Sequence, residues 1–184
     1  MLKTEPQYLR STNLPEIMEK KTFRKTLTPE QAYVKIRHYC AFQERNHAEV
    51  KTKLSTMGIG WTAINEIVSK LIEEGFLNEE RFANAFVGGK FRVKGWGKKK
   101  IEMELRKKGI SAYSIQKALR DEIDMADYEK TLTKLMQKKW SSIKGQGITS
   151  YVKQAKVRQY FLSRGYENSL ITKVLKGVIE KEMD

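Results

Sequence analysis

The sequence predicts an all-α protein, built as an elongated, curved tandem array of three three-helix repeats. The first observation behind this class is an apolar pattern that recurs at equal distances around three glycines. The second is that no segment alternates cleanly between apolar and polar residues, as a strand between hairpin turns would. The third is that the three prolines stand at positions 6, 15 and 29, so none falls inside a predicted helix beyond its first turn.

The repeat is centred on Gly58, Gly109 and Gly165, which are spaced by 51 and 56 residues. Apolar residues stand four and eight positions before each glycine, and six and ten positions after it. The matched sets are Leu54, Leu105 and Phe161; Val50, Ile101 and Val157; Ile64, Ile115 and Ile171; and Val68, Leu119 and Leu175. Steps of four place side chains on one helix face, and glycine readily adopts the left-handed conformation that ends a helix. Each repeat therefore contains a helix, a glycine turn and a second helix.

A further amphipathic stretch precedes each pair of helices and completes the unit. Its apolar residues are Tyr33, Ile36 and Tyr39 in the first unit, Phe82, Phe86 and Val87 in the second, and Tyr128, Leu132 and Leu135 in the third. Helices are expected at 30–42, 47–57, 62–74, 79–92, 98–108, 112–123, 126–140, 150–164 and 168–181. Ser111 and Asn168 are expected to be N-caps, because short polar side chains accept bonds from the first free N–H groups.

These helices divide the chain into a basic N-terminal arm, 1–27, and three-helix repeats at 28–76, 77–124 and 125–184. A unit of about 50 residues buries only a small core, so the units are expected to pack partly on one another. The short connection at 75–78 leaves little room for a free linker. An extended array of this kind presents a long surface, which suits a long partner.

Charge is distributed unevenly along the chain. Lys and Arg number 36 against 22 Asp and Glu, which gives a net charge of +14. Residues 28–75 carry six basic and six acidic side chains, residues 76–124 carry twelve and seven, and residues 125–184 carry twelve and six. Between positions 130 and 166 there are nine basic residues and no acidic one. Because uncompensated cations repel one another, this window favours a polyanionic partner.

The residues expected to contact phosphate or an acidic surface come from two basic stretches of the second and third units. They are Lys90, Arg92, Lys94, Lys98, Lys99, Lys100, Arg106, Lys107, Lys138, Lys139, Lys144, Lys153, Lys156 and Arg158. Trp96, between two glycines, is expected to pack between helices.

A membrane partner and an extracellular location are not expected. No stretch approaches the ~18 consecutive apolar residues of a spanning helix, and the N-terminus has no apolar core of a signal peptide. The single cysteine, Cys40, forms no internal disulfide and is expected to be buried. The chain is therefore expected to be cytoplasmic.

Enzymatic, metal and cofactor chemistry are not expected either. The glycine-rich run 88–98 lacks the spacing of a phosphate-binding loop, and no strand precedes it. His38, Cys40 and His47 do not form the paired motifs of a zinc site. No serine, cysteine or lysine stands in a recognisable nucleophile and base arrangement.

The segment 76–110 resembles the central signature of the RecX family, and the close of the first unit, 71–77, is also similar to that family. The matching pieces are Arg-Phe-Ala at 81–83, Gly-Trp-Gly at 95–97 and Ile-x-x-x-Leu-x-x-Lys-Gly-Ile at 101–110. The family pattern departs at Gly88 and Gly89, which are expected to weaken the end of helix 79–92, and at Lys98, where proline is frequent.

The resemblance implies a curved tandem three-helix protein that regulates the RecA recombinase negatively. Such a protein lies along the groove of the RecA–single-stranded DNA filament and inhibits strand exchange and ATP hydrolysis, in recombinational DNA repair and the SOS response. The implied partners are the RecA filament and single-stranded DNA, with the chain acting as a monomer.

Two other interpretations remain open at this point. A helix-turn-helix transcription regulator shares the coarse pattern, but such proteins usually dimerise and read one site through one recognition helix. An adaptor that binds only proteins would have no DNA affinity of its own.

Overall fold

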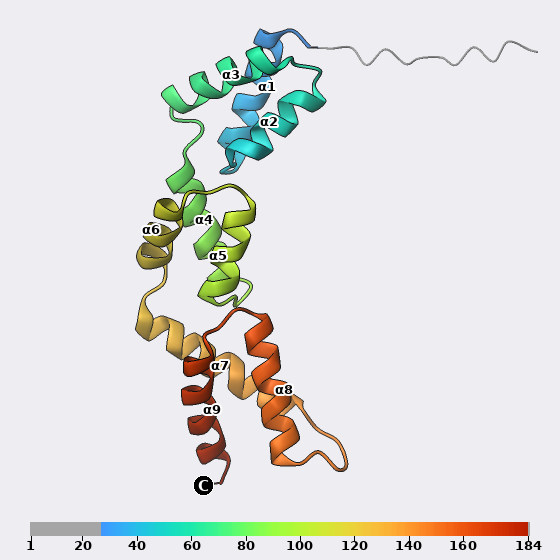
Figure 1. The fold of residues 1–184 in the computed structure, drawn as a ribbon, viewed down its shortest axis with the longest axis vertical. Coiled ribbons are helices and arrows are strands. Elements are labelled where there is room, and N and C mark those ends of the chain that lie inside the picture. Colours follow the sequence, from blue (N-terminus) through green and yellow to red (C-terminus); the bar gives the residue numbers. More distant parts are fainter. Residues whose placement is uncertain (1–26, 184) are drawn as a thin grey trace, which may run out of the picture.

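The computed structural model describes residues 27–183, and within this range the chain forms nine helices and no strand. The helices are α1 (Pro29–Phe42), α2 (His47–Thr56), α3 (Trp61–Glu73), α4 (Glu79–Arg92), α5 (Lys98–Lys107), α6 (Ala112–Glu122), α7 (Met125–Ser142), α8 (Ser150–Ser163) and α9 (Asn168–Met183). They follow one another as three units in an elongated array (Figure 1). The predicted all-α tandem class is confirmed, and each helix begins and ends within two residues of its predicted bounds.

The predicted N-terminal arm, 1–27, lies outside the described residues except for Leu27. Along the part of the chain that is described, no helix combines the length and the apolar character needed to cross a bilayer. Cys40 is buried, as predicted.

The glycine turns close the middle helix of each unit as predicted. Gly58, Gly109 and Gly165 have φ values of +83°, +74° and +84°, in the left-handed region that favours glycine. Ser111 is the N-cap of α6, and its hydroxyl accepts a bond from the Ser114 N–H. The same prediction for Asn168 is wrong. This residue is the first of α9, so its side chain lies past the cap position.

Helix α4 runs unbroken through both of its glycines to Arg92. Gly88 lets the Arg92 guanidinium fold back over the helix and pair with Glu122 of α6 at 2.9 Å. A Cβ on Gly88 would stand 2.0 Å from that guanidinium, whereas a Cβ on Gly89 would meet nothing within 4 Å. The Arg92–Glu122 pair occupies the space above Gly88, so the end of α4 gains a contact with α6.

The apolar side chains form two separate cores. The first unit has its own core, in which Ile36, Leu54 and Leu71 are fully buried. The second and third units share a single core that runs from Phe82 to Val178. Units two and three therefore form one continuous body, and unit one is a second body.

Polar contacts join unit one to unit two. The Arg81 guanidinium donates to Glu44 at 2.8 Å, and the Lys108 ammonium pairs with Glu49 at 2.9 Å. Both pairs are partly exposed, and pairs of this kind contribute about 0–1 kcal/mol each. This junction is therefore held far more weakly than a shared apolar core would hold it.

Units two and three meet where the C-terminal turn of α8 abuts the N-terminus of α5 (Figure 1). The Gly97 N–H donates to the Arg164 carbonyl at 2.8 Å, and the Lys99 N–H donates to the Gly165 carbonyl at 3.1 Å. Helix N-termini have free N–H groups and helix C-termini have free carbonyls, so each end satisfies the other. The two helix dipoles also meet with opposite partial charges.

This approach requires glycine on both sides. A Cβ on Gly97 would stand 2.3 Å from the Gly165 carbonyl oxygen, and a Cβ on Gly165 would stand 2.3 Å from the Lys100 nitrogen. No side chain fits at such distances without moving the backbone.

Two buried tyrosines pack next to the bonded helix ends at this junction. Tyr128 and Tyr166 stack with ring centroids 5.1 Å apart. The Tyr128 hydroxyl accepts from the Lys98 N–H and donates to Glu167, both at 2.9 Å, and the Tyr166 hydroxyl donates to the Gly95 carbonyl at 3.3 Å. Burial raises the pKa of both phenols, and that of Tyr166 to about 12.

We predict that Gly165→Ala destabilises the protein much more than Gly109→Ala. Both glycines have positive φ, but an added Cβ meets nothing within 4 Å at Gly109. Left-handed strain alone should cost about 1 kcal/mol at Gly109, and overpacking should bring the loss at Gly165 to about 3 kcal/mol. Denaturant unfolding monitored by circular dichroism measures both, and equal losses would contradict the close approach described above.

We predict that alkali weakens the wild-type fold more than it weakens Tyr166→Phe. A tyrosine whose folded pKa is raised from 10.0 to about 12 stabilises the fold fully below pH 10 and loses that contribution as the pH rises through 12. Phenylalanine has no such titration, and the remaining alkaline effects are common to both proteins. Urea midpoints at pH 9 and at about pH 11.5 give the comparison, and parallel losses would argue against a buried neutral Tyr166.

Candidate nucleic-acid interface

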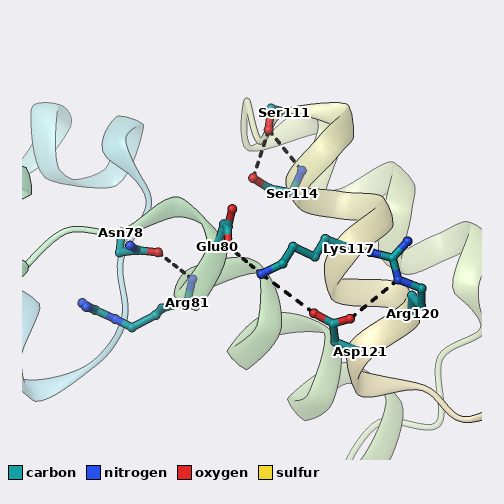
Figure 2. A network of polar contacts seen from close by, with 8 residues as sticks. All are labelled: Asn78, Glu80, Arg81, Ser111, Ser114, Lys117, Arg120 and Asp121. Carbon is teal, nitrogen blue, oxygen red and sulfur yellow. Dashed lines mark hydrogen bonds and ion pairs between the residues drawn. The ribbon is translucent and has the colours of Figure 1, made fainter.

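The seam between α4 and α6 neutralises several cations of the second unit (Figure 2). The Lys117 ammonium lies 2.7 Å from Glu80 and 3.9 Å from Asp121. Arg120 also lies 3.8 Å from Asp121. Because Glu80 and Asp121 already pair with these cations, this seam is a poor surface for a polyanion.

Three of the predicted contact residues are in ion pairs. Arg92 pairs with Glu122 across α4 and α6, and on α5 Arg106 pairs with Glu102 at 2.7 Å and Lys107 with Glu104 at 3.0 Å. A fourth, Arg158, donates to the side chains of Asn168 and Thr172. These four are engaged within the protein.

The remaining predicted residues differ in their surroundings. The Lys98 ammonium packs at the junction, 3.0 Å from the Met125 sulfur and 5.1 Å from the centre of the Tyr128 ring. The exposed ones are Lys94, Lys99, Lys138, Lys144 and Lys156. Lys90, Lys100, Lys139 and Lys153 are half-buried against aromatic rings.

In the second unit two of these lysines flank Trp96. Their ammonium groups lie 5.1 Å (Lys90) and 4.7 Å (Lys100) from the ring. Trp96 itself is half-buried against the shared core, in agreement with its predicted packing role. The Lys100 ammonium also donates to the Ser163 carbonyl at 3.3 Å, which carries the basic surface across the junction into unit three.

In the third unit two cations lie over Tyr160. The Lys139 ammonium and the Arg164 guanidinium are each 4.8 Å from the ring centre. Arg164 also donates to the Lys94 carbonyl on the unit-two side of the junction. Contacts between a cation and a ring hold the charged group in place without neutralising it.

These residues form a continuous surface, which we call the junction band. Its members are Phe86, Lys90, Trp96, Lys100, Lys139, Tyr160 and Arg164. None of its four cations pairs with a carboxylate among the described side chains, those of residues 27–180. Cations interleaved with aromatic rings are typical of surfaces that bind single-stranded nucleic acid.

Tyr160 and Arg164 are not among the residues predicted from the sequence to contact phosphate or an acidic surface. Arg164 lies within the acid-free window, and Tyr160 precedes it by four residues, one helical turn, so a signal was present. Their meeting with Lys139 of α7 depends on the packing of two helices, which no local pattern specifies.

The chain matches two family models over most of units two and three. The second three-helix domain of RecX matches residues 78–119, and the third three-helix domain of RecX matches residues 127–175. The first match lies within the predicted repeat 77–124, and the second lies within the predicted repeat 125–184.

Relatives called regulatory protein RecX show the same relationship. The relative from Clostridium botulinum strain Alaska E43 is 30% identical over 162 residues, which are 86% of this chain and 75% of that protein. The relative from strain Eklund 17B is 32% identical over 143 residues, which are 76% of this chain and 66% of that protein. The chain spans 54% of the relative from Oceanobacillus iheyensis, so some relatives are considerably longer.

The fold has a counterpart in a solved structure. The crystal structure of RecX from Lactobacillus salivarius superposes with a TM-score of 0.72 at 25% identity, covering 82% of this chain and 96% of that one. Taken with the domain matches and the curated relatives, this similarity places the chain in the RecX family of regulatory proteins.

Proposed function

We propose that this chain is a negative regulator of the RecA recombinase. In this proposal it lies along the groove of the RecA–single-stranded DNA filament and inhibits strand exchange and ATP hydrolysis in DNA repair and the SOS response. It acts in the cytoplasm as a monomer and catalyses no reaction. The observation that carries the proposal is an uncompensated basic band that crosses two units of a RecX-family tandem array.

The architecture supports this role in two ways. Units two and three share one core, so the junction band is presented on a single body that can bridge neighbouring filament subunits. Unit one is attached through two partly exposed ion pairs and through Leu77, which precedes α4 and is buried in the core of unit one. Because unit one shares no extended core with unit two, it has freedom to adjust to a second subunit. Occupation of the groove would exclude a second DNA and hinder the subunit rearrangements that ATP turnover requires.

A DNA-binding transcription regulator is the alternative, because three-helix units also occur in helix-turn-helix proteins. Footprinting distinguishes the two. A sequence-specific reader protects one defined site, whereas a filament regulator protects none on DNA alone.

We predict that the wild-type protein inhibits ATP hydrolysis by RecA on single-stranded DNA at sub-stoichiometric ratios. A variant neutralised to Gln at three band lysines, Lys90, Lys100 and Lys139, and at the neighbouring exposed Lys138 should need at least about tenfold more protein, because their contacts with phosphate or acidic surface are lost. The matched control carries Gln at Arg106, Lys107, Lys117 and Arg120, which has the same net charge but changes cations that are already paired. It should inhibit nearly as well as the wild type.

Failure of the wild-type protein to inhibit at several-fold excess would refute the recombinase assignment. Equal loss in both variants would show that net charge, and not the band, governs the inhibition.

We predict that affinity for single-stranded DNA falls with salt at a log–log slope of about −4, for about six phosphate contacts at about −0.7 each. Lys138→Gln with Lys139→Gln should make the slope shallower by about 1.4. Lys130 and Lys134 lie on the same helix, α7, and are exposed, so their double substitution is the matched control and should change the slope little. Fluorescence anisotropy across a salt series gives all three slopes, and a salt-insensitive wild type would refute phosphate contact.

A further inference from the structure

Two hollows lie between α7 and α8, and the Tyr160 side chain lines both of them. The first, of about 310 Å³, is lined by Leu135, Lys138, Lys139, Ser142, Tyr160, Phe161 and Arg164. The second, of about 510 Å³, is lined by Lys139, Ile143, Ala155, Lys156, Gln159, Tyr160 and Ser163. Lys139 and Tyr160 belong to both, so the hollows are neighbours separated by one ring and one cation.

The rims of both hollows are positively charged. Lys138, Lys139 and Arg164 border the first, and Lys139 and Lys156 border the second. No carboxylate lines either hollow in the described part of the chain. This lining favours an anionic ligand whose negative charge lies near these basic side chains.

Apolar side chains also line the hollows. They are Leu135 and Phe161 in the first, and Ile143 and Ala155 in the second. Between them the Tyr160 ring packs edge-on against Phe161 with centroids 5.0 Å apart. The Tyr160 side chain lines both hollows. Such a surface suits a ligand that has a flat apolar group next to a negative charge.

A single DNA strand combines these two requirements. Its bases present apolar faces that stack on aromatic rings, and its phosphates meet the surrounding cations. A duplex keeps its bases stacked inside and offers only phosphates, and an acidic peptide has charge at its side-chain ends without a flat apolar group beside each one. Because the two hollows share Lys139 and Tyr160, two groups that fill them lie next to each other, as successive nucleotides of one strand do.

We infer that these hollows bind two successive nucleotides of single-stranded DNA, with one base on each side of Tyr160 and the intervening phosphate at Lys139. A base that stacks on Tyr160 displaces the Lys139 ammonium from the ring face, and the freed cation then meets the phosphate. From here the strand can continue past Ser163 to Lys100 and Trp96. This inference deepens the proposed function and rests on it for the identity of the polyanion.

The test measures the affinity of the full chain, without RecA, for a fluorescent oligothymidine of about 15 nucleotides. Gln159→Glu is nearly isosteric and places a negative charge in the second hollow, so it should weaken binding about tenfold through repulsion of phosphate. Gln137→Glu adds the same charge on exposed α7 surface outside both hollows and is its matched control. It should stay within about twofold of the wild type.

The role of the ring is tested separately. Tyr160→Ala removes the stacking surface and should weaken binding about tenfold, whereas Tyr160→Phe keeps it and should bind within about twofold of the wild type. Tyr151→Ala on the same helix removes a tyrosine that is 81% exposed and lines neither hollow, so its binding should be unchanged. Circular dichroism checks that each variant is folded. If Tyr160→Ala is not folded, the comparison of Gln159→Glu with Gln137→Glu still tests the inference.

Three results would overturn the inference. They are equal loss in Gln159→Glu and Gln137→Glu, wild-type affinity in a folded Tyr160→Ala, and equal wild-type affinity for oligothymidine, an abasic oligonucleotide and a duplex. The RecA ATPase assay separates this from the proposed function. If Gln159→Glu still inhibits RecA and still binds DNA as the wild type does, the proposed regulator is supported and the nucleotide subsite is refuted. Tyr160-dependent DNA binding with no RecA inhibition leaves the subsite standing without the regulator.

Discussion

The end-to-end bonding of α8 and α5 is the constraint on which the arrangement of units two and three depends. A helix end leaves four N–H groups or four carbonyls without internal partners, and a buried one requires partners from elsewhere. Here the two ends supply partners to each other through Gly97, Lys99, Arg164 and Gly165. Because these are backbone bonds, they fix the distance and the angle between units in a way that apolar packing alone would not. The buried tyrosines behind them exclude water from the joint.

The same joint positions the basic surface. Arg164 belongs to the turn that carries Gly165, and Lys100 follows directly on the bonded turn of α5. Their side chains extend to opposite sides of the contact, toward Tyr160 and toward Trp96. A shift of the two helices would therefore separate the two halves of the junction band. The first unit lacks such a joint, so its attachment depends on ion pairs that salt and solvent weaken.

The sequence was sufficient for the helices and the glycine turns, because both are set by local periodicity around Gly58, Gly109 and Gly165. It was less informative about the cations. The pair of Glu102 and Arg106 is four residues apart and was predictable from spacing alone. The pair of Arg92 and Glu122 spans 30 residues and depends on how α4 packs on α6. The close contact of Gly97 with Gly165 could not be predicted either, because each glycine is already explained locally as a residue at a helix end.

The uncompensated cations of the third unit have a physical cost that bears on their purpose. Nine basic residues without an acidic one repel each other and reduce the stability of the free protein. Contacts of Lys139 and Arg164 with the Tyr160 ring offset part of that repulsion, but at about 0.5–1 kcal/mol each at exposed sites they do not remove the charge. Unit two shows that this chain can neutralise its lysines where they serve structure, as Lys117 does. The four cations of the junction band, Lys90, Lys100, Lys139 and Arg164, have no carboxylate partner among the described side chains, and a polyanion that binds there reduces the repulsion and supplies partners to them at once.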